Sequence, residues 1–361
     1  MKKRIIVLSG LLLITLLAAG CASGAKPVPA SNAPAASGTK PGGELNLFIW
    51  TEYIPDAVLQ KFTNETGIKV NASTYSSNED MLSKVKASNK GIYDIVVPTD
   101  YMVKLMIGQG LLAPLDMDKI PNLKNIGTQY LNQPYDPGNK YSVPYMGGVA
   151  ALCVNTDKVR EDITSFEQIF DPRYANSIVA LDDFRAVIGL TAKTLGYSMS
   201  ETDPAKLAGI KEKLLTLKPN IKVLDSDSPK TVMISGETSI GFMWNAEIAL
   251  SIAENPKIRI VFPKEGAYLF IDNLAILDGA KNKENAEMFI NFILRPDVSK
   301  MISDEFPYLN PNLEAVKLLG DSYINNPASN IPEEVFKNGE YIQDVGGAID
   351  IYNDIWTEFT R

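Results

Sequence analysis

One junction near the start of the folded region constrains the fold more than any other part of the chain. Residues 45–49 form a run that is apolar apart from Asn46, typical of a strand buried on both faces. Trp50, Glu52 and Tyr53 follow at once, and Pro55 then opens a helical pattern. An indole, a carboxylate and a phenol are therefore expected where a strand meets a helix, the position at which open α/β sheets bind ligands. The alternative is that both rings cap the core and Glu52 is solvated.

Strand-like and helix-like patterns alternate three times from this junction onward. The strand-like runs are residues 45–49, 68–70 and 93–97, and each precedes apolar residues at helical spacing. This alternation predicts a parallel sheet covered by helices. A chain of 361 residues is too long for one small core, so two lobes are expected. The aromatic-rich tail, residues 340–359, is expected to dock as a helix.

Three polar signals mark expected helix starts. Ser77 with Asp80 three residues later is typical of a helix N-terminus, and Thr164 with Glu167 forms an expected capping box. Asp100 is expected to be the N-cap of the helix that follows the third strand-like run. Each assignment fixes where a helix begins and thus which side chains face the preceding segment.

The ionisable residues exclude several classes of function. The formal net charge is −8, and loss of the basic leader residues Lys2, Lys3 and Arg4 would lower it to −11. An acidic chain argues against nucleic acid as a partner and favours cationic ligands. The absence of histidine excludes Ser-His and Cys-His catalysis and removes the commonest metal ligand. With Cys21 assigned to the leader, Cys153 has no second cysteine for a disulfide or a zinc site.

The N-terminus has the pattern of a bacterial lipoprotein leader. A basic start precedes an apolar stretch, residues 5–17, that is too short to span a bilayer. Small residues stand directly before Cys21, so residues 1–21 are expected to be a signal peptide with a lipobox whose Cys21 becomes lipidated. Simple secretion with a free Cys21 is the alternative. Residues 22–43, rich in Ala, Pro, Gly and Ser, are expected to form a flexible tether that would span on the order of 25 Å.

Eight side chains of two kinds lie mostly at expected strand ends or lobe crossings. The aromatic ones are Trp50, Tyr53, Tyr101, Trp244 and Phe270, and the acidic ones are Glu52, Asp183 and Asp272. A cleft that combines both kinds suits a flexible methylene chain bearing ammonium groups, because carboxylates pair with the charges and ring faces add cation–π attraction. Burying four methylenes contributes about 3 kcal/mol, whereas micromolar affinity needs about 8 kcal/mol. Net favourable ion pairing must therefore supply the rest, after desolvation of both partners.

A set of short motifs, taken in this order and spacing, resembles the spermidine/putrescine-binding proteins of bacterial ABC importers. The motifs lie at residues 50–53 (WTEY), 65–70 (ETGIKV), 93–98 (YDIVVP), 263–266 (PKEG), 290–292 (INF), 294–298 (LRPDV), 338–340 (NGE) and 344–346 (DVG). None of these motifs is decisive alone. Together they are highly specific, and the similarity covers residues 44 to about 352.

The resemblance implies an α/β, type II periplasmic-binding-protein fold with two lobes. Each lobe would be a mostly parallel sheet flanked by helices, with the ligand cleft between them. The first lobe would comprise residues 44–149 and 272–319, and the second residues 150–271 and 320–361. Such proteins are not enzymes and use no cofactor or metal. Hinge motion would close the two lobes on the ligand.

The resemblance also assigns ligand contacts, because aromatic rings in the family sandwich the methylenes and carboxylates hold the ammonium groups. The matching residues are Trp50, Glu52, Tyr53, Tyr101, Asp183, Trp244, Asp272 and Tyr308, with Thr51, Thr99 and Ser226 at polar contact positions. Three positions depart from the family's spermidine binders. Ala186 stands in place of a second acidic residue, and Phe270 stands in place of a tryptophan. Ile342 stands where glutamine is usual, although Gln343 lies next to it. The missing carboxylate and indole predict that putrescine binds comparably to spermidine or better.

These expectations define a monomeric, lipid-anchored receptor in the periplasm or on the outer face of the cytoplasmic membrane. It would capture putrescine and/or spermidine and deliver it to the permease subunits of an ABC importer. One alternative keeps the fold but binds another organic amine, an amino acid or an opine. A second is an extracytoplasmic enzyme with paired carboxylates, such as a glycosidase, which glycoside turnover would reveal. A third, ferric iron held by tyrosines, would show a charge-transfer colour.

Overall fold

The computed structural model describes residues 42–361. The expected signal peptide, its lipidation site Cys21 and nearly all of the expected tether lie outside these residues. β1 (Gly43–Trp50) contains the apolar run, and α1 (Asp56–Thr66) follows it. Gly67 ends α1 in the left-handed conformation, φ +79°, which glycine adopts without steric cost. The expected strand–helix junction is thus confirmed.

The ten strands of the described residues form one sheet. The other strands are β2 (Ile68–Tyr75), β3 (Ile95–Val96), β4 (Ser142–Asn155), β5 (Ile178–Ala180), β6 (Ile221–Leu224), β7 (Ile240–Trp244), β8 (Ile258–Val261), β9 (Tyr268–Ile276) and β10 (Glu340–Tyr341). Their order is β2-β1-β3-β9-β4-β7-β5-β6, with β10 beside β9 and β8 beside β4. β1 pairs in parallel with β2 and β3, and β5 does so with β6 and β7. The central strands β4 and β9 pair antiparallel with each other and with β7 and β3.

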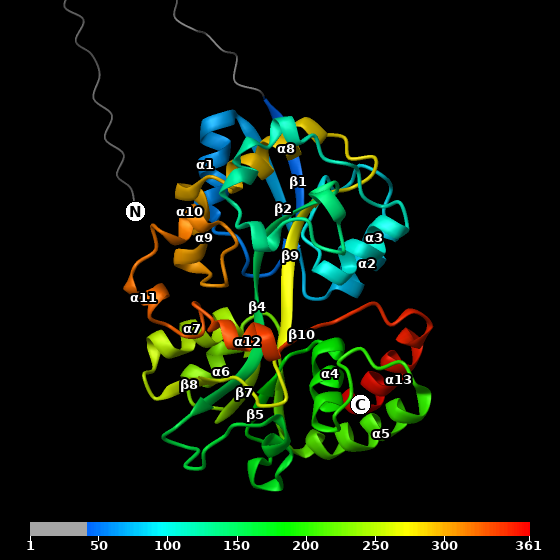
Figure 1. The fold of residues 1–361 in the computed structure, drawn as a ribbon, viewed down its shortest axis with the longest axis vertical. Helices are drawn as coiled ribbons and strands as arrows, with labels where there is room; N and C mark the ends of the chain where they lie inside the picture. The colour runs from blue at the N-terminus through cyan, green and yellow to red at the C-terminus, as the bar shows by residue number, and fades with distance from the viewer. Residues whose placement is uncertain (1–41) are drawn as a thin grey trace, which may run out of the picture. The chain divides into compact units, whose positions relative to one another are not determined.

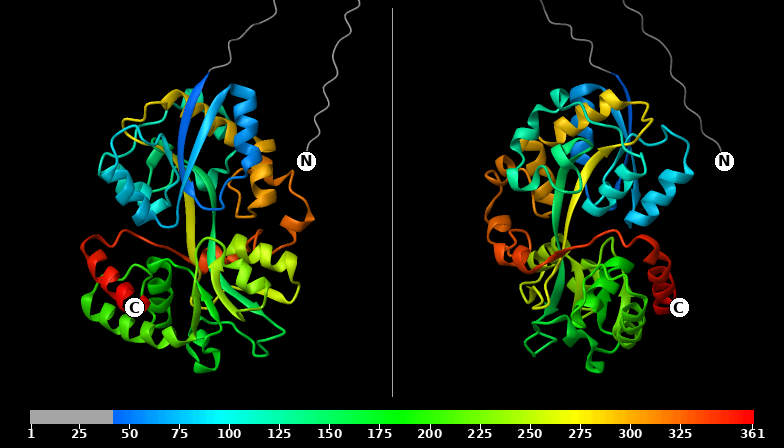
Figure 2. Two further views of the ribbon diagram at one scale, coloured as in Figure 1. Left: turned by 180° about the vertical axis from the view of Figure 1, so that it is seen from behind. Right: turned by 45° about the vertical axis from the view of Figure 1, so that its right-hand side comes forward.

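Helices flank this sheet in two groups, one at each end of β4 and β9 (Figure 1 and Figure 2). The first lobe, around β1–β3, contains α1, α2 (Asn78–Ala87), α3 (Asp100–Gly108), α8 (Lys283–Ile293), α9 (Pro296–Glu305) and α10 (Leu313–Val316). The second lobe, around β5–β8, contains α4 (Phe184–Thr194), α5 (Pro204–Leu217), α6 (Lys230–Ile234), α7 (Asn245–Glu254), α12 (Glu333–Asn338) and α13 (Ile349–Thr360). The short helix α11 (Asp321–Ile324) lies on the connection between them. This arrangement is the expected two-lobed α/β architecture.

The strands β4 and β9 run from one lobe into the other. Every residue of both strands is buried, as expected for strands that cross the middle of a molecule. Their pairing extends from Ser142 opposite Ala275 to Ala150 opposite Tyr268. The expected lobe boundaries after residues 149 and 271 fall inside these two strands, so the lobes are joined by hydrogen-bonded sheet rather than by loose linkers.

Two of the expected helix starts can be compared directly with the structure. Ser77 is the N-cap of α2, and its hydroxyl accepts a hydrogen bond from the Asp80 N–H at 3.1 Å, as predicted. The expected cap at Thr164 is wrong, because Ser165 caps the helix Phe166–Phe170. That segment is a 3₁₀ helix, and the cap binds the backbone two residues onward instead of three.

The prediction for Asp100 is also wrong, because Thr99 occupies the N-cap position of α3. The Asp100 carboxylate instead accepts hydrogen bonds from the backbone N–H groups of Tyr101, at 2.6 Å, and Ile271, at 3.1 Å. It therefore ties the start of α3 to β9. Burial raises the pKa of Asp100 to about 8, although both backbone bonds favour the charged form.

The C-terminal tail is a helix only over its second half. β10 and a 3₁₀ turn, Gly346–Ala348, come first, and α13 then packs against α4 and α5.

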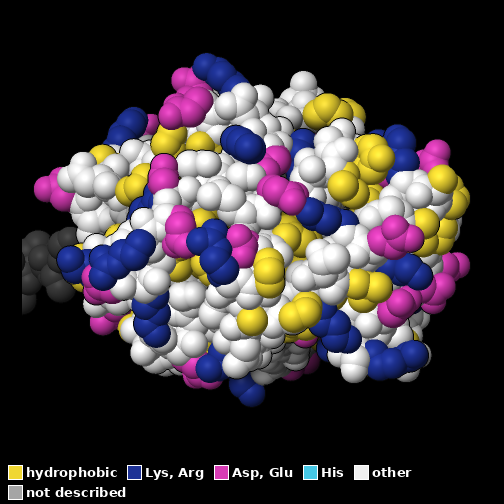
Figure 3. Space-filling view, turned by 90° about the horizontal axis from the view of Figure 1, so that it is seen from below, with side chains coloured by type: hydrophobic (Ala, Val, Ile, Leu, Met, Phe, Trp, Pro, Cys, Tyr) yellow, Lys and Arg dark blue, Asp and Glu magenta, His cyan; other side chains and the backbone are white. Residues whose placement is uncertain are grey.

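The face shown in Figure 3 mixes basic and acidic side chains with scattered hydrophobic ones, so neither sign of charge dominates it. Within residues 42–361, no helix combines the length and the apolar character needed to cross a membrane.

Candidate ligand-binding site

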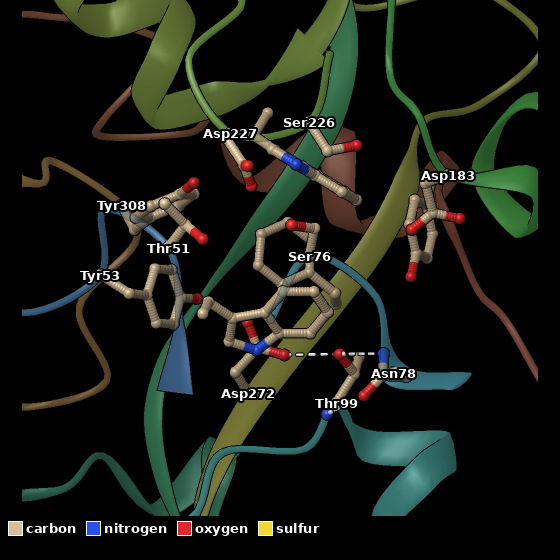
Figure 4. Close-up of a pocket in the computed structure, with 14 residues that line it drawn as sticks. Thr51, Tyr53, Ser76, Asn78, Thr99, Asp183, Ser226, Asp227, Asp272 and Tyr308 are labelled. Carbon is tan, nitrogen blue, oxygen red and sulfur yellow. Dashed lines mark hydrogen bonds between the residues drawn. The ribbon is translucent and has the colours of Figure 1, made fainter. Parts of the chain in front are cut away.

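One pocket lies where the carboxyl ends of strands from both lobes meet (Figure 4). β1 ends at Trp50 and β7 ends at Trp244, while Asp183 and Ser226 follow β5 and β6. β9 passes through the pocket at Asp272. The space outside protein atoms measures about 520 Å³, part of it open to solvent.

Ten of the twelve residues expected to contact the ligand line this pocket. They are Trp50, Thr51, Tyr53, Thr99, Asp183, Ser226, Trp244, Phe270, Asp272 and Tyr308. The two others, Glu52 and Tyr101, lie outside the lining. The structure thus gathers most of the expected side chains in one place, and their contact with a ligand stays a prediction.

Asp272 gives the pocket a buried carboxylate, with only 4% of the residue exposed. Its oxygens accept hydrogen bonds from the Tyr53 hydroxyl at 2.5 Å and the Thr99 hydroxyl at 2.6 Å. The Asn78 amide in turn donates to Thr99 at 2.9 Å (Figure 4). Burial raises the pKa of Asp272 to about 7, although both hydroxyl bonds favour the charged form. Within residues 42–361, no lysine or arginine forms an ion pair with Asp272 or contributes to this pKa shift.

Aromatic rings line the pocket in edge-to-face contact. Ring centroids lie 5.0 Å apart for Tyr53 and Tyr308, 6.1 Å for Tyr308 and Phe270, and 5.3 Å for Phe270 and Trp244. The Trp50 indole is held separately, because its N–H donates to a backbone carbonyl at 2.8 Å. These contacts fix the rings in place, and ring faces so fixed can pack against methylenes and attract cations.

Asp183 and Ser226 offer two further polar groups in the same pocket (Figure 4). Asp183 is the N-cap of α4, where its carboxylate accepts a hydrogen bond from the Ala186 N–H at 3.0 Å. Burial raises the pKa of Asp183, opposed by that bond and by the charge of Arg185. The Ser226 hydroxyl is shielded from solvent and has no hydrogen-bond partner among the described residues. Because an unsatisfied buried hydroxyl is costly, Ser226 is a ready partner for a ligand N–H group.

Glu52 does not line the pocket, although its neighbours Thr51 and Tyr53 do. Its backbone adopts the left-handed conformation, φ +50°, which is uncommon for a residue other than glycine. Its carboxylate forms an ion pair with the ammonium group of Lys230, at the start of α6. A protein cation therefore already satisfies the charge that the sequence assigned to the ligand.

Tyr101 contributes to a different cavity. That cavity is also lined by Asp100, Tyr130, Tyr135 and Tyr341. The Tyr101 hydroxyl donates to Glu79 at 2.9 Å, and the Arg185 guanidinium lies over the ring at 5.3 Å from its centroid. The sequence analysis grouped Tyr101 with Tyr53, but Tyr53 lines the candidate pocket and Tyr101 lines this second cavity.

The sequence comparisons agree with this geometry. Residues 57–331 match the family model described as bacterial extracellular solute-binding protein. The chain belongs to the bacterial extracellular solute-binding proteins. Members of this family are transport components and not enzymes. The match confirms the family predicted from the motifs, and the solved relatives confirm the type II periplasmic-binding-protein fold.

Several relatives of this solute-binding protein cover most of its length. The spermidine/putrescine-binding periplasmic protein of Escherichia coli K12 is 41% identical over 313 residues, covering 86% of this chain and 90% of that protein. The solved structure of the spermidine/putrescine substrate-binding protein PotD from Streptococcus pneumoniae is 35% identical, with a TM-score of 0.74 and coverage of 88% and 99%. The TpPotD lipoprotein of Treponema pallidum is 29% identical, with a TM-score of 0.77 and the same coverage.

The pocket of this solute-binding protein has four lining residues that the sequence patterns did not single out. They are Ser76, Asn78, Asp227 and Tyr268. Ser76 and Asn78 follow the end of β2, so the rule that ligands meet strand ends could have found them. Tyr268 lies two residues before Phe270 in β9, and the two-residue period of a strand places both on one face.

The three positions that depart from the family's spermidine binders differ in their surroundings. Ala186 is fully buried in the first turn of α4, and Phe270 occupies the pocket wall between Trp244 and Tyr308. Ile342 is buried with 1% exposure, and Gln343 lines the other cavity. Of these positions, only Phe270 lines the candidate binding pocket.

Proposed function

We propose that this protein captures a polyamine, putrescine and/or spermidine, in the pocket at Asp272 and delivers it to the permease subunits of an ABC importer. The observation that carries the proposal is the Asp272 carboxylate, which is buried between aromatic rings and lacks a lysine or arginine counter-charge among the described residues. An ammonium group of the ligand would supply that charge. The names of the Escherichia coli and Streptococcus pneumoniae relatives support the same class of ligand.

A second ammonium group has a carboxylate of its own in the pocket. Asp183 stands on a different wall from Asp272, and the Ser226 hydroxyl is free to bind an N–H group (Figure 4). Methylenes between two such ammonium groups would pass along Trp50, Trp244 and the other rings. Four buried methylenes contribute about 3 kcal/mol, and each cation–π contact contributes about 0.5–2 kcal/mol.

Titration calorimetry tests the ligand class. The full-length chain, unfolded and refolded in detergent to remove retained ligand, would be titrated with putrescine, spermidine, spermine and arginine. Micromolar or tighter binding of a di- or triamine is the expected result. If the folded protein failed to bind any polyamine, the proposed function would be wrong and another organic amine would have to be sought.

The ranking of polyamines is a finer part of the same proposal. Ala186 leaves the first turn of α4 without a second carboxylate, and Phe270 offers a smaller ring than a tryptophan. Both differences weaken a site for three ammonium groups more than a site for two. Putrescine is therefore expected to bind comparably to spermidine or better, and a strong preference for spermidine in matched titrations would contradict this ranking.

Attachment to the membrane through Cys21 is likewise a proposal. The leader pattern around Cys21 supports it, as does the description of the Treponema pallidum relative as a lipoprotein. Cys21→Ser is expected to move the protein from the membrane fraction to the soluble fraction and to abolish labelling by a fatty-acid probe. Unchanged membrane association of that variant would show that another feature holds the protein there.

The proposed capture mechanism is closure of two lobes, the first made of residues 44–149 and 272–319 and the second of residues 150–271 and 320–361. Because β4 and β9 join the lobes, a small change in the twist of these strands would be enough to move one lobe against the other. Small-angle scattering with and without putrescine is expected to show a smaller radius of gyration with ligand. The same measurement gives the mass, which is expected to be that of a monomer.

A further inference from the structure

Lys230 stands between two carboxylates that come from different lobes. Its ammonium group forms an ion pair with Glu52, which follows β1 in the first lobe. It also lies 3.1 Å from both oxygens of Glu247, in the first turn of α7 in the second lobe, and 3.0 Å from the Ser228 hydroxyl. The Lys230 side chain is 20% exposed and that of Glu247 is 5% exposed, whereas that of Glu52 is 38% exposed, so the cluster is buried at Glu247 and open to solvent at Glu52.

This cluster adjoins the candidate pocket. Glu52 lies between Thr51 and Tyr53, which both line the pocket, and Lys230 begins the helix that follows the lining residues Ser226 and Asp227. Tyr308 connects the two regions electrostatically. Burial and then the charges of Glu247, Asp272 and Glu52, in that order, raise the pKa of its phenol. Tyr308 lines the candidate pocket together with Asp272, Thr51 and Tyr53.

The Lys230 side chain has the chemistry of one half of a polyamine, since it is an ammonium group at the end of four methylenes. Glu52 and Glu247 hold this ammonium as a polyamine site would hold a ligand ammonium. Burial lowers the pKa of Lys230, but the two carboxylates outweigh that effect and raise it overall. Lys230 is thus a permanent cation at this end of the cleft.

We propose that Lys230 occupies the carboxylate of Glu52, so that a ligand ammonium group cannot pair with it and must use the carboxylates that line the pocket, Asp272, Asp183 and Asp227. The inference rests on the proposed polyamine function and adds the residue that sets the ligand's charge. A triamine held by Asp272 and Asp183 would have to place its third ammonium at Asp227 or displace Lys230 from Glu52. A diamine needs neither change.

The test frees Glu52 without leaving another buried charge unpaired. Lys230→Met alone would leave the buried Glu247 carboxylate without a counter-charge, so Lys230→Met is combined with Glu247→Gln. Spermidine affinity of this double variant is expected to rise roughly ten- to a hundredfold, the range for a charged hydrogen bond. Putrescine affinity is expected to stay within about threefold of wild type.

Three further proteins sharpen the result. Adding Glu52→Gln to the double variant should abolish the gain, because the freed carboxylate is then gone. Lys222→Met removes the same charge from the same lobe at an outlying ion pair with Glu237, and should leave both affinities unchanged. Lys230→Gln serves if the double variant does not fold, because glutamine can still bind Glu247 but carries no charge; a smaller gain for spermidine is expected.

Different results would contradict the role of Lys230 and the proposed polyamine function. Putrescine binding with an unchanged ratio of spermidine to putrescine affinity in the folded Lys230 variants would overturn the role of Lys230 alone. A gain that persists after Glu52→Gln would overturn it as well, because the freed carboxylate would not be the cause. Failure of wild-type protein to bind either amine would overturn the proposed function and this inference with it.

Discussion

Asp272 and Glu52 are both acidic residues beside aromatic rings of the cleft, yet their surroundings differ in one decisive respect. Asp272 accepts hydrogen bonds from two hydroxyl groups and has no lysine or arginine counter-charge among the described residues. Glu52 forms an ion pair with Lys230, whose ammonium also binds Glu247. A carboxylate of the first kind requires a cation from outside, whereas one of the second kind does not.

This difference shows what makes an acidic residue a ligand contact. Residue type and position near a strand end bring a carboxylate to the cleft. The carboxylate is available to a ligand cation only if no protein cation already pairs with it. A buried carboxylate without a partner is costly to ionise, which is why the pKa of Asp272 rises to about 7. The uncompensated carboxylate therefore lowers the stability of the ligand-free protein, and a bound cation would supply the missing counter-charge.

The largest effect is expected from Asp272→Asn, which removes the charge but keeps the shape and the capacity to hydrogen bond. Polyamine affinity should fall roughly 100-fold or more, because a buried charge pair with the ligand is lost. Calorimetry with putrescine measures the loss, and the unfolding temperature without ligand controls for folding. A loss of less than about tenfold would place the essential carboxylate elsewhere.

The pH dependence of affinity should follow the same group. In the free protein the pKa of Asp272 is about 7, and only the ionised form pairs with an ammonium. Affinity should therefore fall as pH decreases below 7, by about tenfold per pH unit, and level off above 7. Glu247 also has a pKa raised by burial, to about 7, so the profile should be repeated with Glu247→Gln. If the slope disappeared in that variant, the titrating group would be Glu247.

Stability of the ligand-free protein should change with pH in the opposite sense. The folded-state pKa of Asp272 lies above its ordinary value of 3.8, so the folded protein holds this proton more tightly than the unfolded chain. The resulting contribution is fully present below about pH 4 and is lost as pH rises through 7. The free energy of unfolding of Asp272→Asn, measured relative to wild type in denaturant, should therefore increase between pH 4 and pH 7. The slope would be at most about 1.4 kcal/mol per pH unit, and a difference independent of pH would contradict the assignment.

A smaller effect is expected from removing one ring beside the charges. Trp244→Ala takes away a cation–π partner and apolar contact area, so affinity for putrescine should fall about 3- to 30-fold. Trp356→Ala provides the control, because Trp356 lies on α13 outside the pocket lining. Equal losses in both variants would indicate a general effect on the fold and not a contact with the ligand.

The smallest effect separates the two carboxylates most clearly. Glu52→Gln should change putrescine affinity by no more than about threefold, because Lys230 and not the ligand holds the Glu52 charge. Lys230 keeps Glu247 as a partner in that variant. A loss as large as that of Asp272→Asn would mean that bound ligand takes Glu52 from Lys230.

Much of the fold and part of the candidate site follow from local patterns. The apolar run before Trp50 and the cap at Ser77 each depend on residues close in the sequence, and both predictions are confirmed. Strand patterns also predicted that Trp50 and Asp183 stand at strand ends, but β1 and β5 run in opposite directions, so only the tertiary structure brings these two ends into one pocket. The type II periplasmic-binding-protein fold was implied by the resemblance of the motifs to the spermidine/putrescine-binding proteins.

The partners of each charge were decided only by the tertiary structure. Lys230 lies 178 residues from Glu52, and no local pattern connects them. Whether Tyr101 faces the pocket depends on how α3 packs beside Arg185, and the hydrogen bonds of Asp100 depend on β9. The sequence by itself determined which side chains stand at strand ends, because backbone geometry is local. Packing of one lobe against the other decided which of those charges are already neutralised, because ion pairing acts through space between segments far apart in the chain.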